Sequence, residues 1–182
     1  MRVSRFTAEE DRSLADTEIE LLSFPYDTEH VFHMGGAMWM DGQSDLHIGT
    51  GDNSHHSPGL PVDMRLDWKN WDSFRSAANT RDYRGKILRI HPEADGSYSI
   101  PKDNLFPNGK DGLAEIYAMG IRNPFRISVD DSTGTLYIGD VGPNISAELG
   151  IEPAGYDEIN ATKEACNFGW PSFIGPNEAL PV

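Results

Sequence analysis

The stretch VDDSTGTLYIG, residues 129–139, decides the fold class of this chain. A valine is followed by Asp, Ser, Thr and Gly residues, and then by a run of alternating apolar side chains that ends at a glycine. Because Asp, Ser and Gly favour tight turns, the stretch predicts two antiparallel strands joined as a hairpin. The stretch MDGQSDLHIG, residues 40–49, repeats this order of strand, turn and strand. A repeated hairpin indicates a fold built from similar β units.

Strand-forming runs dominate the rest of the chain. Each is short and bounded by Gly, Pro, Asp or Asn. We expect strands at residues 3–6, 46–48, 87–90, 116–119, 125–129 and 136–138. Helix candidates are confined to two short segments, residues 7–15 and 71–78. The sequence therefore predicts an all-β fold.

Two pairs of matching residues lie along the chain, and the separation within each pair is nearly the same. Leu46 matches Leu136 in the repeated hairpins, and Arg5 in Val-Ser-Arg-Phe matches Arg89 in Ile-Leu-Arg-Ile. This spacing exceeds the roughly 40–50 residues of common propeller blades. We interpret the polar stretch at residues 54–82 as an insertion that enlarges one unit, since its removal restores a blade-like period.

Charge and cysteine content narrow the possible partners. The 182 residues carry 15 Lys and Arg against 29 Asp and Glu, a formal net charge of −14, which disfavours nucleic acids and anionic membrane surfaces. Cys166 is the single cysteine, so an internal disulfide and a multi-cysteine metal site are excluded. No apolar run approaches the roughly 18 residues of a membrane span, and we expect no membrane insertion and no signal peptide in this chain.

Five motifs occur in a fixed order. They are HMGG at residues 33–36 with GTGDN at 49–53, RGKILRI at 84–90, GIRNPF at 120–125, GDVGPN at 139–144, and YDEIN with NFGWP between 156 and 171. In this order they resemble the glucose/sorbosone dehydrogenase family, over residues 2–177. The insertion and its approach to Arg84 are similar to those of bacterial members fused to other domains.

The resemblance implies a fold and an activity. Residues 1–182 would form part of a six-bladed β-propeller, about two blades plus an outer strand of a third. The implied reaction oxidises the anomeric hydroxyl of an aldose-type sugar, with hydride transfer to calcium-bound pyrroloquinoline quinone (PQQ). The resemblance also implies a periplasmic or extracellular location and an electron acceptor, for which a cytochrome c is one candidate.

Within this resemblance His33 aligns with the general base that takes the proton from the sugar. An imidazole suits that task because its ordinary pKa lies close to neutral pH. Asp52 aligns with the acid that orients this histidine through a hydrogen bond. The residues also have structural interpretations, because His33 could cap a loop before two glycines and Asp52 could form an Asx-turn.

Two further pairs align with cofactor and metal positions. Arg122 and Asn123 align with residues that contact PQQ, and a permanently charged, forked donor suits quinone and carboxylate oxygens. Gly142 and Pro143 align with positions whose backbone carbonyls bind the active-site calcium. The alternatives are an exposed arginine beside an Asn-Pro turn, and an ordinary Gly-Pro turn after a strand.

Other conspicuous residues receive structural interpretations. Asp157 and Glu158 align with acids near a second calcium in some family members, but exposed surface acids are the more frequent meaning of such a pair. We expect aromatic side chains to pack in the cores of the blades. These are Trp39, Phe125, Phe168 and Trp170.

Two alternatives to the enzyme remain open. A propeller of this fold can lose its chemistry and serve as a binding module for carbohydrate or protein. The chain by itself can also be inactive, because an incomplete propeller leaves strand edges and blade faces uncovered.

Overall fold

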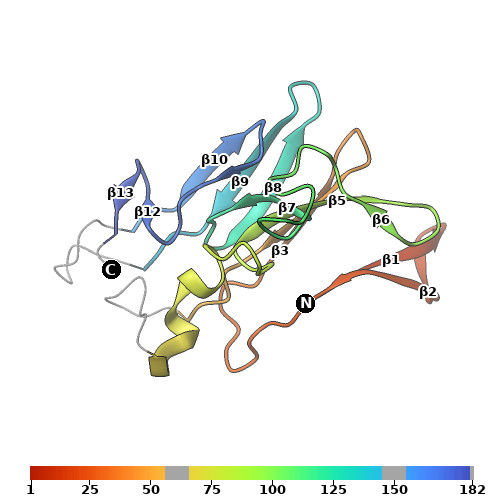
Figure 1. Ribbon diagram of the computed structural model, residues 1–182. Coiled ribbons are helices and arrows are strands. Elements are labelled where there is room, and N and C mark those ends of the chain that lie inside the picture. Colours follow the sequence, from red (N-terminus) through yellow and green to blue (C-terminus); the bar gives the residue numbers. More distant parts are fainter. Residues whose placement is uncertain (56–65, 145–154, 181–182) are drawn as a thin grey trace.

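The computed structural model describes residues 1–55, 66–144 and 155–180, and strands dominate it (Figure 1). The strands are β1 (Arg2–Glu9), β2 (Arg12–Ser23), β3 (Gly35–Met40), β4 (Leu46–Thr50), β5 (Lys86–Pro92), β6 (Tyr98–Ser99), β7 (Ile116–Met119), β8 (Pro124–Asp130), β9 (Thr135–Asp140), β10 (Glu158–Thr162), β11 (Cys166–Asn167), β12 (Phe173–Ile174) and β13 (Glu178–Ala179). The all-β prediction is confirmed, and each of the six predicted strands lies within an observed one.

Two sheets form the body of the molecule, and all but one of their strand pairs are antiparallel. One has the order β11-β7-β5-β4-β3, with β11 parallel to β7 and β6 paired to the far end of β5. The other has the order β10-β9-β8, and its strand β8 packs beside β3. In the described residues neither sheet closes on itself, so a partial propeller of about two blades stays a prediction.

Strand β5 lies at the centre because both of its faces are buried. Successive side chains of a strand point to opposite faces of a sheet. Leu88 and Ile90 accordingly join one core cluster, while Ile87 joins a second cluster that includes Leu136 and Ile138 of β9. The first sheet therefore separates two hydrophobic cores, one of which it shares with the second sheet.

The two hairpins repeated in the sequence are β3-β4 and β8-β9, and their turns contact each other. The backbone N–H of Gly42 donates to the Asp131 carboxylate at 2.8 Å. The repeat predicted from the sequence thus corresponds to two similar β units side by side.

The helix predicted at residues 7–15 is wrong. These residues end β1, turn at Glu10 and Asp11, and begin β2. Glu10 has φ 54°, a left-handed conformation typical of tight hairpin turns. Long-range strand pairing overrides the local helix preference here, because the base of the hairpin buries Val3 and other apolar side chains in the first core.

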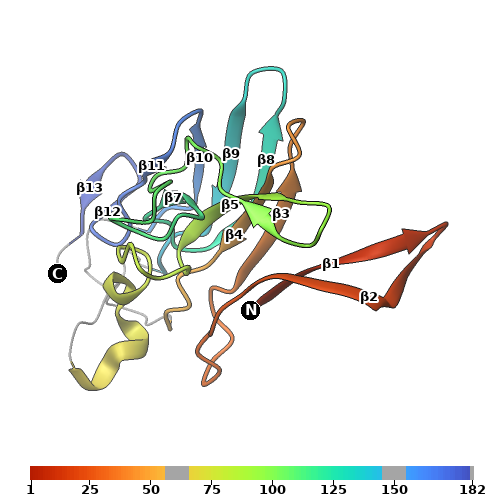
Figure 2. The same cartoon turned by 45° about the vertical axis from the view of Figure 1, so that its right-hand side comes forward.

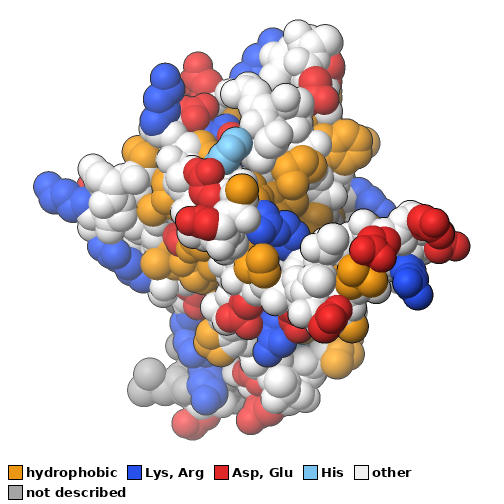
Figure 3. Space-filling view, turned by 90° about the vertical axis from the view of Figure 1, so that its right-hand side faces the viewer, with side chains coloured by type: hydrophobic (Ala, Val, Ile, Leu, Met, Phe, Trp, Pro, Cys, Tyr) orange, Lys and Arg blue, Asp and Glu red, His pale blue; other side chains and the backbone are white. Residues whose placement is uncertain are grey.

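The β1-β2 hairpin extends away from the two sheets, as Figures 1 and 2 both show. Figure 3 views the molecule from the side that carries it. Acidic and basic side chains are interspersed there with hydrophobic ones, so this face is not uniformly acidic despite the net charge of −14.

The inserted stretch contains two 3-10 helices, η1 (Leu66–Trp71) and η2 (Ser73–Arg75). The helix expected at residues 71–78 is therefore only partly present, because Asp72 interrupts it. Asp72 has an extended backbone and caps η2, its carboxylate accepting from the Phe74 N–H at 2.9 Å. Residues 56–65 of the insertion lie outside the described residues. No helix in the described part of the chain is long and apolar enough to cross a membrane.

The expectation of four core aromatics holds only in part. Trp170 is buried beside Ala77 and Ile174, and Phe168 packs against the second core. Trp39 and Phe125 are 39% and 52% exposed, so their assignment to a core is wrong. Both rings lie in stretches of β3 and β8 whose neighbouring side chains are exposed as well, Met38 and Met40 in one strand and Arg126 in the other.

Candidate functional site

His33 and Asp52 lie together at one end of the first sheet. His33 precedes β3, Asp52 follows β4, and the antiparallel register places Gly35 opposite Thr50. The Nδ1 atom of His33 lies 2.9 Å from Oδ1 of Asp52, and the two side chains are 9% and 0% exposed. The hairpin geometry therefore pairs two residues that are far apart in sequence.

The backbone around this pair is tightly constrained. His33 has φ 49°, an uncommon conformation for a residue with a side chain. Its carbonyl accepts from the Asn53 N–H at 3.1 Å, and a Cβ on Gly51 would lie only 1.9 Å from this oxygen. Only glycine fits at residue 51, so the loop conformation that presents His33 is fixed by the strand ends.

The carboxylate of Asp52 accepts hydrogen bonds from several segments of the chain besides His33. Ser54 donates its backbone N–H and its hydroxyl at 2.9 and 3.0 Å. The Ser73 hydroxyl and the Trp170 indole N–H donate to Oδ2 at 2.7 and 2.8 Å. Burial alone would raise the pKa of Asp52, but His33, the charge of Arg122 and the Ser54 N–H outweigh it and hold that pKa well below its usual range.

Sequence reasoning missed these three donors. Ser54 could have been found, because the Asx-turn considered for Asp52 predicts a partner two residues on. Trp170 stands in the NFGWP motif, where its large apolar ring favours a place in the core over a role as donor. Ser73 carries no sequence signal, since it lies in a polar insertion and reaches Asp52 only in the folded chain.

Arg122 and Asn123 join this site through the second sheet. The backbone carbonyl of Arg122 accepts from the Asp52 N–H at 2.7 Å. The Asn123 side-chain oxygen accepts from the Gly35 N–H at 3.1 Å, which ties it to the His33 loop. The Arg122 guanidinium lies 5.8 Å from the centre of the Trp170 ring. The structure thus brings four of the predicted site residues together.

Gly142 lies against the other side of Arg122. Nη1 of Arg122 donates to the carbonyl oxygens of Val141 and Gly142 at 2.9 and 2.6 Å. The Gly142 N–H in turn donates to the Asp157 carboxylate at 2.9 Å. Burial lowers the pKa of Arg122, while the neighbouring carboxylates oppose that shift.

Buried and exposed acids differ in role here. Burial raises the pKa of Asp140 to about 7, against the backbone N–H groups of Arg122 and Asn123 that donate to its two oxygens. Glu158 lies in β10 and accepts from the Gly175 N–H. Asp157 and Glu158 therefore accept from backbone N–H groups of segments 15 and 17 residues away along the chain. No cluster of three or more potential metal-binding side chains occurs in the described residues.

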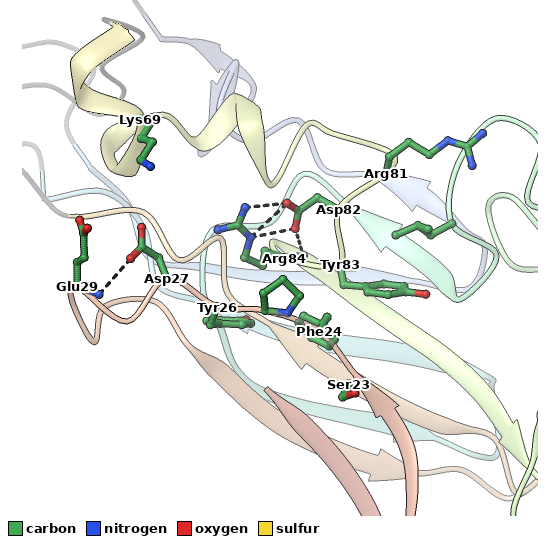
Figure 4. Close-up of a pocket in the computed structure, with 12 residues that line it drawn as sticks. Ser23, Phe24, Tyr26, Asp27, Glu29, Lys69, Arg81, Asp82, Tyr83 and Arg84 are labelled. Atoms are coloured by element: carbon green, nitrogen blue, oxygen red, sulfur yellow. Dashed lines mark hydrogen bonds and ion pairs between the residues drawn. The ribbon is translucent and has the colours of Figure 1, made fainter.

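A cavity of about 640 Å³ is lined mainly by residues 23–29 and 81–84 (Figure 4). Its walls include Tyr26 and the ion pair of Asp82 with Arg84, 2.7 Å apart. The Tyr26 hydroxyl donates to the Gly51 carbonyl at 3.1 Å, next to the pair. Lys69 reaches into the cavity from the insertion. None of the predicted site residues lines this space, so it adjoins the candidate site without containing it.

A family model described as Glucose / Sorbosone dehydrogenase matches residues 1–178. The HIPL1 protein of Arabidopsis thaliana is 34% identical over 119 residues, which is 58% of this chain and 16% of that protein. The aldose sugar dehydrogenase YliI of Escherichia coli (strain K12) is 27% identical over 139 residues, covering 76% of this chain and 29% of that protein.

A solved structure matches nearly the whole chain. It is the PQQ-bound form of aldose sugar dehydrogenase from Streptomyces coelicolor, with a TM-score of 0.63 and 23% identity over 99% of this chain and 44% of that one. At this identity the likeness shows the fold alone. The chain spans between 16% and 44% of the length of these three proteins.

Proposed function

The chain belongs to the glucose/sorbosone dehydrogenase family, and from that premise we propose that the whole protein oxidises the anomeric hydroxyl of an aldose-type sugar with PQQ as hydride acceptor. The observation that carries this proposal is the buried His33–Asp52 pair, with Arg122 and Asn123 beside it. The same proposal places the protein in the periplasm or outside the cell, with a separate electron acceptor such as a cytochrome c.

His33 is the proposed base. The ionised Asp52 accepts from Nδ1–H, and this bond fixes the tautomer in which Nε2 carries the free lone pair. Nε2 has no hydrogen-bond partner among the described residues, so it is available to take a proton from a sugar hydroxyl. Asp52 stays anionic because its other donors hold it so, and its role is to orient and stabilise the imidazolium that forms.

The side chains of Arg122 and Asn123 can donate hydrogen bonds to an anionic quinone. The Nε and Nη2 groups of Arg122 have no partner among residues 1–55, 66–144 and 155–180, so donors remain for a carboxylate or a quinone oxygen. When bound, PQQ supplies the two-electron acceptor that the side chains lack. A fixed positive charge beside it would stabilise the negative charge that develops on hydride transfer.

Calcium does not fit the Gly142 carbonyl in this arrangement. That oxygen already accepts from the Arg122 guanidinium at 2.6 Å, and a calcium ion on it would lie close to a like charge. The space between Arg122, Gly142 and Pro143 amounts to about 10 Å³, close to the minimum for a single water molecule. Calcium binding by Gly142 and Pro143 therefore stays a prediction, and it requires Arg122 to move.

Dye reduction by the whole protein tests this function. With PQQ added, the protein should reduce an artificial electron acceptor when given an aldose. His33→Ala should lower turnover by about 10²–10⁴-fold, the range for loss of a general base. His47→Ala is the matched control, because His47 also pairs with a carboxylate, that of Asp41 at 2.9 Å, but at the other end of β4.

Two results would contradict the proposal. One is PQQ binding without oxidation of any sugar in a broad panel, which would favour a carbohydrate- or protein-binding module. The other is a folded His33→Ala variant with the turnover of the wild type.

A further inference from the structure

We propose that Ser73, a residue of the inserted stretch, is a positioning residue that locks the carboxylate of Asp52 and through it orients His33. This inference rests on the proposed function for its kinetic consequence. Its geometric basis is independent of the reaction.

The two oxygens of Asp52 are used differently. Oδ1 receives the imidazole of His33, while Oδ2 receives donors from separate parts of the chain: the Ser73 hydroxyl at 2.7 Å and the Trp170 indole N–H at 2.8 Å. Ser54 bridges both oxygens, its hydroxyl lying 3.0 Å from each. Because donors converge on Oδ2 from different directions, the carboxylate cannot rotate without breaking several charge-assisted hydrogen bonds.

Ser73 is held in place by the body of the first sheet. It is 0% exposed and begins η2, directly after the capping residue Asp72. Lys86 of β5 donates from Nζ to the carbonyl oxygens of Ser76 at 2.8 Å and Ala77 at 2.9 Å. The insertion is thus fastened to a core strand immediately after the serine that contacts Asp52. This attachment restricts the movement of Ser73 relative to Asp52.

The consequence concerns the orientation of the imidazole. The two oxygens belong to one rigid carboxylate. Because its donors hold Oδ2 in place, Oδ1 also has a fixed position for the Nδ1–H of His33. Loss of the Ser73 hydroxyl leaves Oδ2 with its donors from Trp170 and Ser54 only, so Asp52 is held less firmly and the direction of the His33 ring is less narrowly fixed. The substrate contacts themselves are unchanged.

Ser73→Ala in the whole protein tests this role. We expect kcat to fall about 10–100-fold, the loss that corresponds to one hydrogen bond to a charged group, with KM changed by less than about twofold. Ser76→Ala is the matched control. Ser76 is also a buried serine of the insertion, and its hydroxyl contacts the Ser73 carbonyl at 3.4 Å but not Asp52. It should keep kcat within about twofold of the wild type.

A second readout does not depend on turnover. With selectively ¹⁵N-labelled histidine, the Nδ1–H proton of His33 should give a downfield resonance, assigned by its absence in His33→Ala. Ser73→Ala should shift or broaden this resonance, and Ser76→Ala should leave it in place. If the protein oxidised no sugar, the proposed function would fail while this resonance would still decide the role of Ser73.

A folded Ser73→Ala variant with wild-type kcat and an unchanged His33 resonance would overturn the inference. If Ser73→Ala does not fold, Trp170→Phe replaces it, since that variant keeps a large ring and removes one donor from the same oxygen. Wild-type kcat and an unchanged resonance in Trp170→Phe would then be equally decisive against a locked carboxylate.

Discussion

Asp52 and Asp140 are both buried, yet their pKa values shift in opposite directions. Asp52 accepts from an imidazole and two hydroxyls and lies near Arg122, so the anion is stabilised. Among the described residues Asp140 accepts only from backbone N–H groups, and the charges of Glu158 and Asp52 lie near it, so burial dominates. The sequence shows two Asp residues after strands and cannot distinguish them. The difference arises from partners that meet only on folding.

The raised pKa of Asp140 predicts a pH dependence of stability. Below about pH 4 this carboxyl is protonated in both the folded and the unfolded state. Between about pH 4 and the folded-state pKa of about 7, the unfolded chain releases the proton and the folded chain keeps it. The contribution of Asp140 to stability therefore falls as the pH rises through this window, and it is constant above it.

Asp140→Asn removes the titrating group. Urea denaturation of the whole protein at pH 4.5 and pH 7 measures the change. From pH 4.5 to pH 7 the free energy of unfolding should fall less in the variant than in the wild type. An equal change in both proteins would show that Asp140 does not retain its proton in the folded state.

Among the elements, the sequence predicts the repeated hairpins well because turn residues and alternating side chains carry that information locally. The strand positions at 46–48 and 136–138 are confirmed for this reason. The failure at residues 7–15 has the opposite cause, since pairing with distant residues decides the structure there. The insertion shows the same limit: its polar composition reveals that it is an insertion, but not that Ser73 reaches Asp52.

Lys86 connects the insertion to β5, and its loss should weaken that connection. In Lys86→Met the Ser76 and Ala77 carbonyls keep second donors from backbone N–H groups. The Arg84 carbonyl, 2.7 Å from Nζ, loses its donor. We expect the free energy of unfolding to fall by about 1–3 kcal/mol, the cost of one unsatisfied buried carbonyl. Urea denaturation of the whole protein measures it, with the exposed Lys102→Met as control. A stability at or above that of the wild type would show that burial of the ammonium costs more than its hydrogen bonds return.

At the scale of the whole molecule, the net charge of the chain and the number of cations at the candidate site decide whether it can bind PQQ. Its formal net charge is −14, and the cation predicted to contact PQQ, Arg122, donates to the carbonyl oxygens of Val141 and Gly142. The chain spans 44% of the PQQ-bound enzyme it resembles in fold.

The last prediction is that this 182-residue chain, expressed alone, does not bind PQQ tightly. PQQ is a tricarboxylate, so its transfer from water requires several charge-assisted partners. Arg122 would have to give up its carbonyl contacts to serve as one of them. Titration calorimetry of the chain and of the whole protein with PQQ, in millimolar Ca²⁺, measures the difference. The whole protein should give a one-to-one isotherm and the chain should not. Submicromolar one-to-one binding by the chain would instead show that Arg122, Asn123 and their neighbours already form a complete PQQ site.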